Sequence, residues 1–206
     1  ARAGGIDIRE YAAAENVVGS DGGVTVEPAG DAVTGSQLLV AVGRSPALER
    51  LNLTAAGVEH SAKGVRVTKG LKSVSNAKVY AIGDAAGGLQ FTHAAGYHAG
   101  VTIRSALFGL SAKASDAHTP WATHTDPELA QVGLTEAAAR ELHGDGLEVL
   151  RFDYQENDRA RAELATDGFV KVMVVKGKPV GATIVGRQAG ELISTWALVI
   201  ANGLKV

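Results

Sequence analysis

A short apolar segment that ends in Gly83-Asp84 constrains the fold of this chain more than any other feature of its sequence. The segment 78–82 is rich in strand-forming residues, and a Gly/Ala-rich loop and a helical pattern over 92–107 follow it. A strand that stops at Gly-Asp and leads into a helix is typical of an open α/β sheet, in which ligands bind at the carboxyl ends of the strands. The alternative is an aspartate that closes an ordinary turn.

The residue types at this point suit a polar ligand that carries negative charge. Gly83 lets a ligand approach the backbone, and the Asp84 carboxylate can accept a hydrogen bond from a ribose or ribityl hydroxyl. The helix begins near Thr92, so its free N–H groups and its positive dipole end face the same space. In that helix Ala95, Ala99, Ile103 and Leu107 share one face, which we expect to be the packed face.

The first 45 residues alternate short strand-like pieces with turns. Strands are expected at 6–8 and 24–26, and Asp21-Gly22-Gly23 has the composition of a hairpin turn. The apolar run 37–42 ends at Gly43 and favours a strand buried on both faces, although a short buried helix has the same pattern. A further strand-like piece lies at 65–67.

The last part of the chain, from residue 118, has a different organisation. Strands are expected at 121–125, 129–133, 147–152, 169–175 and 180–185, and helices at 135–142 and 190–202. Thr135 can cap the first helix and Gly144 can end it. Consecutive strands with helices on one face indicate an α+β domain with an antiparallel sheet.

The helix expected at 190–202 points to a homodimer. Its apolar residues surround most of the helix axis, whereas a helix that covers one sheet needs a single apolar stripe. We therefore expect a two-fold symmetric dimer through this module, with a buried interface of more than ~2,000 Å². Trp196 on this helix, and Trp121 at the start of the module, are interpreted as core or interface anchors.

Composition excludes several classes of protein. The 20 Lys and Arg residues nearly balance the 22 Asp and Glu residues, which argues against a nucleic-acid or polybasic membrane surface. No apolar run reaches the ~18 residues that span a bilayer, and the first residues do not form a signal peptide, so we expect a cytoplasmic protein. The chain has no cysteine and therefore, within these residues, no disulfide, thiolate metal site or cysteine nucleophile.

Neither the histidines nor the acidic residues form a convincing catalytic or metal site. His93 and His98 are five residues apart, which is not the spacing of a helical metal pair, and we expect no metal. Asp153, Glu156 and Asp158 lie beside Arg159 and Arg161, which favours a solvated, salt-bridged loop over paired catalytic carboxylates.

Three blocks of sequence, in order, resemble the pyridine nucleotide–disulfide oxidoreductases. LLVAVGRSPALERLNL is similar to the end of that family's nicotinamide domain and the return to its FAD domain, and YAIGDAAG with FTHAAGYHAG is similar to its FAD-binding segment. PWATHTDPELAQVGLTEAAARE and VKVMVVKGKPVGATIVGRQAGELISTWALVIANGLKV resemble its dimerisation domain. The resemblance covers nearly the whole chain and is nearest to the mercuric reductase and dihydrolipoamide dehydrogenase branch.

The resemblance implies a fold class, domains and an activity. It implies partial α/β FAD- and NAD-binding domains followed by an α+β dimerisation domain with an antiparallel sheet. Residues 1–45 would end the NAD(P)-binding domain, 46–117 would be the carboxyl-terminal part of the FAD-binding domain, and 118–206 would be the dimerisation domain, truncated at its end. The implied enzyme uses FAD and NAD(P)H, and passes hydride through flavin to a disulfide, a metal ion or a similar small-molecule acceptor.

Individual residues match the family's cofactor contacts. Asp84, after Gly83, matches the aspartate that binds the flavin ribityl chain, and Gln90, Phe91, Thr92 and His93 match the segment whose backbone faces the flavin pyrimidine ring. That ring becomes negatively charged on reduction, which a helix N-terminus stabilises. Gly43 matches a glycine that the nicotinamide cofactor contacts; without the resemblance it is a plain strand terminator.

The family's catalytic groups do not lie in this sequence. Its GxGxxG motifs and redox cysteine pair belong before residue 1, and its His–Glu dyad belongs after Val206, so we expect a carboxyl-terminal piece that lacks both ends of the chemistry and is inactive by itself. Two alternatives remain open: a non-catalytic dimerisation module, and a cysteine-independent flavin reductase of the same architecture that reduces quinones or oxygen.

Overall fold

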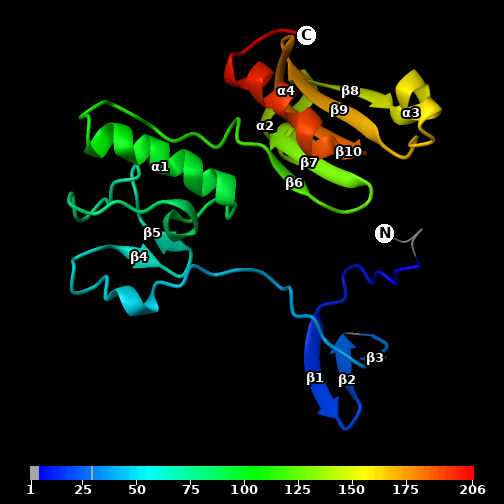
Figure 1. Ribbon diagram of the computed structural model, residues 1–206, viewed down its shortest axis with the longest axis horizontal. Helices are drawn as coiled ribbons and strands as arrows, with labels where there is room; N and C mark the ends of the chain where they lie inside the picture. The colour runs from blue at the N-terminus through cyan, green and yellow to red at the C-terminus, as the bar shows by residue number, and fades with distance from the viewer. Residues whose placement is uncertain (1–4, 29) are drawn as a thin grey trace. The chain divides into compact units, whose positions relative to one another are not determined.

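The computed structural model describes residues 5–28 and 30–206 (Figure 1). The chain forms two compact units, Ala1–Arg44 and Ser45–Val206. Each unit has its own secondary structure, and each is described by itself below.

The first unit is a three-stranded antiparallel sheet in the order β1-β2-β3. Its strands are β1 (Ala14–Ser20), β2 (Gly23–Pro28) and β3 (Val33–Gly35). The strand expected at 24–26 and the hairpin turn that precedes it are confirmed. The strand expected at 6–8 is wrong, because these residues form no ladder with any described strand and a strand exists only through its pairing.

The apolar run 37–42 is not the buried strand that its composition predicts. It is in neither a strand nor a helix, and Leu39 and Val42 are 88% and 90% exposed. A strand buried on both faces needs a hydrogen-bonded neighbour and two covering layers. No described part of the chain supplies them for residues 37–42.

The first part of the second unit consists mainly of loops around a small core. It contains η2 (Glu49–Leu51), β4 (His60–Ser61), β5 (Gly64–Val65) and η3 (Gly83–Ala86), and Leu48, Val58, Val65 and Ala81 form its core. The strand expected at 78–82 is wrong: only Tyr80 pairs, in an isolated bridge with Lys72. Of the piece expected at 65–67, only Val65 lies in a strand.

The helix α1 (Thr92–Ala106) confirms the predicted helix, but it buries a different face. Ala94, His98 and Val101 are buried, whereas Ile103 and Leu107 are 48% and 75% exposed. The buried residues follow the i, i+4, i+7 spacing of one helical stripe. The elements that pack against α1, and not its apolar residues alone, therefore decide which face of the helix is buried.

The rest of this unit is a five-stranded antiparallel sheet with the order β6-β7-β10-β9-β8. The strands are β6 (Trp121–Thr123), β7 (Glu128–Gly133), β8 (Leu147–Asp153), β9 (Phe169–Val175) and β10 (Lys178–Gly186). The helices are α2 (Glu136–His143), α3 (Asp158–Ala162) and α4 (Ala189–Ala201), with η4 (Gly144–Gly146) and η5 (Tyr154–Glu156) between them. All five strands and both helices expected here are confirmed, whereas α3 was not expected.

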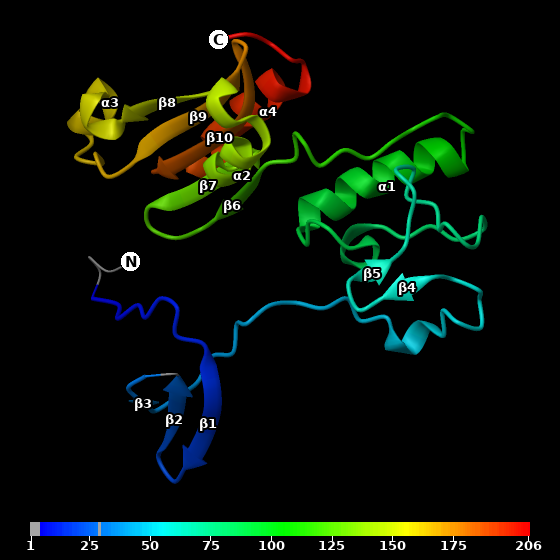
Figure 2. The same cartoon turned by 180° about the vertical axis from the view of Figure 1, so that it is seen from behind.

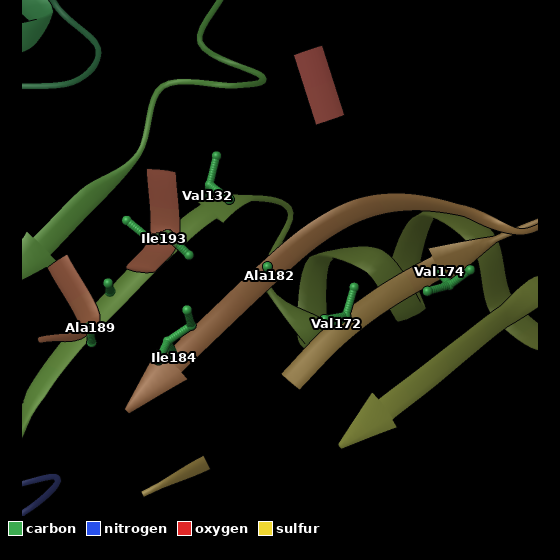
Figure 3. Close-up of a cluster of buried hydrophobic side chains, with 8 residues drawn as sticks. Val132, Val172, Val174, Ala182, Ile184, Ala189 and Ile193 are labelled. Atoms are coloured by element: carbon green, nitrogen blue, oxygen red, sulfur yellow. The ribbon is translucent and has the colours of Figure 1, made fainter. Parts of the chain in front are cut away.

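The helices α4 and α2 cover opposite faces of this sheet. Figure 1 shows α4 in front of the strands, and Figure 2, from behind, shows α2 in front. Thr135 caps α2 through its side chain, as expected, and Gly144 follows the end of that helix. The main core lies between α4 and the sheet (Figure 3). Ala189 and Ile193 of α4 pack there against residues of β7, β9 and β10, which are Ala130, Val132, Val172, Val174, Ala182 and Ile184.

Candidate functional site

The candidate site begins at the turn that follows Ile82. Gly83 opens η3 with φ 55°, a left-handed conformation that favours glycine. A Cβ atom at Gly83 would lie 2.8 Å from the Cβ of Ala95, so this turn packs directly against α1. The turn closes through the Gly87 N–H, which donates to the Asp84 carbonyl at 3.0 Å. Asp84 is half-buried, and its position after the apolar segment is therefore fixed by close packing.

The backbone of this turn is also held by a histidine from α1. The Gly83 N–H donates to Nδ1 of His98 at 3.1 Å, and both residues are buried. The sequence singles out His98 only by its spacing from His93, which does not suit a helical metal pair. The one sequence signal for its role is that a polar residue occupies the same helical stripe as Ala94 and Val101.

The N-terminus of α1 offers uncapped N–H groups. Phe91 is the N-cap residue, and no side chain caps the helix there. Its first helical hydrogen bond runs from the Ala95 N–H to the Phe91 carbonyl at 3.1 Å. The N–H groups of the first turn have no intrahelical acceptor and carry the positive end of the helix dipole, so this end favours an anionic or electron-rich ligand.

Aromatic rings join the start of α1 to the sheet. The Phe91 ring stacks on the His93 ring, with centroids 5.4 Å apart, and on the Trp121 ring at 6.3 Å. His93 Nε2 lies 2.7 Å from the Pro120 carbonyl, so Nε2 carries the donated proton. Phe91, Thr92, His93 and Trp121 also line a cavity of about 590 Å³. Trp121 therefore anchors the expected flavin-facing segment.

A carboxylate fixes the helix that bounds the other side of this cavity. Glu128 Oε2 accepts a hydrogen bond from the Gly190 N–H at 3.0 Å, in the first turn of α4. This N–H holds the pKa of Glu128 below its usual range, and His124 acts in the same direction. Sequence reasoning missed this contact, because the two partners are 62 residues apart and neither has a local signature.

The structure brings together all but one of the expected cofactor-binding residues. Gly83, Asp84 and the segment 90–93 lie in the second unit, where η3 contacts α1. Gly43 belongs to the first unit, is exposed, and has φ 132°, with open space where a Cβ would lie.

The other candidate clusters have structural roles. Of the five residues expected to form a salt-bridged loop, Asp153 pairs with Arg151 and Arg159 pairs with Glu163, so both use partners outside the expected group. Glu163 also pairs with Arg187. In the described residues, 5–28 and 30–206, no group of histidines and carboxylates could hold a metal ion. Within the same residues, every helix is too short or too polar to cross a membrane.

Two models of one protein family match this chain. "Pyridine nucleotide-disulphide oxidoreductase" matches residues 1–99, and "Pyridine nucleotide-disulphide oxidoreductase, dimerisation domain" matches residues 119–206. Dihydrolipoyl dehydrogenase from Bacillus subtilis (strain 168) is 38% identical over 168 residues, or 81% of this chain and 36% of that protein. Mercuric reductase from Acidithiobacillus ferrooxidans is 35% identical over 209 residues, or 100% of this chain and 38% of that protein.

A solved structure of a flavoprotein disulfide reductase also resembles this chain. The HOCl-induced flavoprotein disulfide reductase RclA from Escherichia coli matches with a TM-score of 0.85 and 29% identity, over 99% of this chain and 47% of that one. The chain therefore spans less than half the length of the relatives and structures that it matches here.

Proposed function

Because this chain belongs to the pyridine nucleotide–disulphide oxidoreductase family, we propose that it supplies the carboxyl-terminal portion of an FAD-dependent oxidoreductase. In this proposal, hydride from NAD(P)H passes through the flavin to a disulfide, a metal ion or a similar acceptor. The relatives that support it are a dihydrolipoyl dehydrogenase, a mercuric reductase and a flavoprotein disulfide reductase. The fold class agrees, with α/β nucleotide-binding parts before an α+β domain built on an antiparallel sheet.

The residues present fit one side of a flavin site. The observation that carries the proposal is the contact between η3 and the uncapped N-terminus of α1, because it places a carboxylate and free N–H donors on neighbouring elements. The absence of a side chain at Gly83 lets η3 pack against Ala95, and its left-handed φ shapes the turn that presents Asp84. When bound, FAD would accept hydride from the nicotinamide and deliver electrons to the acceptor.

Each of these residues has a separate task in the proposal. Asp84 accepts a hydrogen bond from a ribityl hydroxyl and so fixes the position of the cofactor along the turn. The backbone at Gln90, Phe91, Thr92 and His93 presents donors and the positive helix end to the pyrimidine side of the flavin. Gly43 offers an open backbone surface to the nicotinamide cofactor. Residues 1–45, 46–117 and 118–206 remain our assignment of NAD(P)-binding, FAD-binding and dimerisation parts.

We also propose that residues 119–206 form a homodimer through the outer face of α4. The family model that matches them describes a dimerisation domain. Ile193, Trp196 and Ala197 pack on the sheet of their own chain, whereas Leu192 and Leu198 are 47% and 62% exposed. These two leucines belong to a face that the sheet does not cover, and burying them against a second copy is favourable.

Substitution of Asp84 tests the flavin proposal directly. In the full-length protein, Asp84→Ala should weaken FAD binding by about 1–3 kcal/mol, because the ribityl hydroxyl loses its charged partner. Flavin absorbance after dialysis and FAD titration by fluorescence quenching measure this loss. The control is Asp145→Ala in η4, which should retain FAD like the wild type. FAD affinity unchanged in Asp84→Ala would remove the assignment.

The 206-residue chain by itself gives a second test. It should purify without stoichiometric flavin, because it spans less than half the length of the flavoprotein that it matches. A flavin absorbance of one equivalent per chain would show that these residues form a complete cradle.

A further inference from the structure

The Gly83 amide needs an acceptor that its own element cannot supply. Gly83 is the first residue of η3, and the opening N–H groups of a helical turn have no intrahelical partner. Ile82, which precedes it, provides no side-chain cap. A buried N–H without an acceptor is costly, and the acceptor that the structure provides is His98 Nδ1, 3.1 Å away.

This hydrogen bond defines the protonation state of the His98 ring. Because Nδ1 accepts, it has a free lone pair, and the neutral ring carries its proton on Nε2. A doubly protonated imidazolium has two N–H donors and no acceptor, so it would place a donor against the Gly83 N–H. The ring cannot turn away into solvent without cost, because His98 is 5% exposed and lies on the packed face of α1.

We infer that His98 is a positioning residue for the flavin site. His98 holds the Gly83–Ala86 turn, and with it Asp84, only while the imidazole ring is neutral. This inference rests on the proposed function for the role of Asp84. A protonated ring presents two N–H donors and no acceptor, so acidification that protonates His98 would release the Gly83 amide and weaken FAD binding. His98 does not contact the flavin in this proposal; it acts through the backbone of Gly83.

The surroundings of His98 contain charges of both signs. His98 lines a cavity of about 640 Å³, and the ionisable residues of that cavity come from the loops that pack beside α1: Lys69, Lys113 and Asp116. Asp84 follows the hydrogen-bonded glycine in η3, and the Tyr97 ring lies 5.9 Å from the His98 ring. The ammonium groups of Lys69 and Lys113 oppose a positive charge on the ring, whereas the carboxylates of Asp84 and Asp116 favour it.

Two substitutions separate the hydrogen bond from simple packing. His98→Asn keeps an acceptor close to the position of Nδ1 but does not titrate. His98→Leu keeps a bulky side chain on the buried stripe but has no acceptor. His60→Asn is the matched control, because His60 is exposed in β4 and its Nδ1 lies 3.0 Å from the Val58 carbonyl, not from Gly83. FAD affinity is measured for the full-length protein from about pH 8 to about pH 5.5.

The expected pattern is specific. Wild type and His60→Asn should bind FAD about tenfold more weakly at the acid end, His98→Asn should show no such decline, and His98→Leu should bind weakly throughout. Equal affinities of His98→Leu and wild type at pH 8 would overturn the inference. So would an acid decline in His98→Asn that matches wild type, and that comparison remains decisive if the leucine variant fails to fold.

A flavin-independent measurement distinguishes this inference from the proposed function. In the same protein labelled with ¹⁵N at glycine and histidine, His98 Nδ1 should show the shift of an unprotonated, hydrogen-bonded nitrogen. The Gly83 amide should move upfield as His98 titrates. If FAD binds to no variant at any pH, the proposed function fails, while these shifts still decide whether His98 holds the turn. A protonated Nδ1 at neutral pH, or a Gly83 amide that ignores the titration, refutes the positioning role.

Discussion

Truncation of Ile193 measures how much the contact between α4 and the sheet contributes to the stability of residues 119–206. Ile193 is 2% exposed and packs in the cluster that contains Val132 and Ile184, which are 0% and 1% exposed (Figure 3). Each buried methylene contributes about 0.8 kcal/mol, so the transfer term of Ile193→Ala is about 2–2.5 kcal/mol. The cavity that remains under α4 raises the expected loss of unfolding free energy to about 3–4 kcal/mol.

Urea denaturation followed by tryptophan fluorescence is the appropriate assay. Both tryptophans of the chain, Trp121 and Trp196, lie in this part, and Trp196 packs against the cluster itself. Wild type and variants are compared at one protein concentration, because the proposed dimer would make apparent stability depend on concentration. Ile193→Val should lose only about 1 kcal/mol, since it removes one methylene.

The control is Leu142→Ala on α2, where the leucine is 67% exposed. This change should cost less than about 0.5 kcal/mol, because little apolar surface is withdrawn from contact. If Ile193→Ala costs no more than Leu142→Ala, the cluster under α4 is not the main source of stability, and our account of the core is refuted.

Three further predictions concern assembly, pH and flavin. Leu198 on α4 is 62% exposed, and Leu198→Lys should give a monomer by light scattering with unchanged circular dichroism; a persistent dimer would place the interface elsewhere. The pKa of Glu128 is lowered, chiefly by the Gly190 N–H, so its stabilisation is present at neutral pH and is lost as pH falls through the folded pKa. Glu128→Gln should therefore show a smaller loss of urea midpoint on acidification than wild type. Thr92→Asp should lower the flavin midpoint potential in the flavin-loaded protein, and an unchanged or higher potential would count against a flavin at the start of α1.

Local patterns were sufficient for the elements of residues 119–206. The strand β9 has the predicted bounds, the Lys176-Gly177 turn joins it to β10, and Thr135 caps α2. These signals lie within a few residues of the structure that they specify, through alternation, turn chemistry and side-chain capping. Three of the four strand pairs join consecutive strands, and the fourth joins β7 to β10 within the same residues, so the information needed to form this sheet is present within it.

The same reasoning was wrong for two apolar runs that have no partner strand in the described residues. The runs 37–42 and 78–82 have strand composition, yet neither forms a ladder in the described chain. Composition records the preference of a segment for an extended, buried environment, and only the rest of the fold can supply the neighbours. The packed face of α1 was misjudged for a related reason, because Ala94 and Val101 are buried by contacts that no helical period specifies.

For the candidate site, the sequence by itself determined the Gly83-Asp84 turn, the start of α1 near Thr92 and the order of elements that places them together. Only the tertiary structure decided which groups hold that arrangement. The Gly83 amide bonds to His98, 15 residues away, and the Gly190 amide bonds to Glu128, 62 residues away. Neither bond follows from local propensity or periodicity, because each forms only after packing has brought together a buried donor and a distant acceptor.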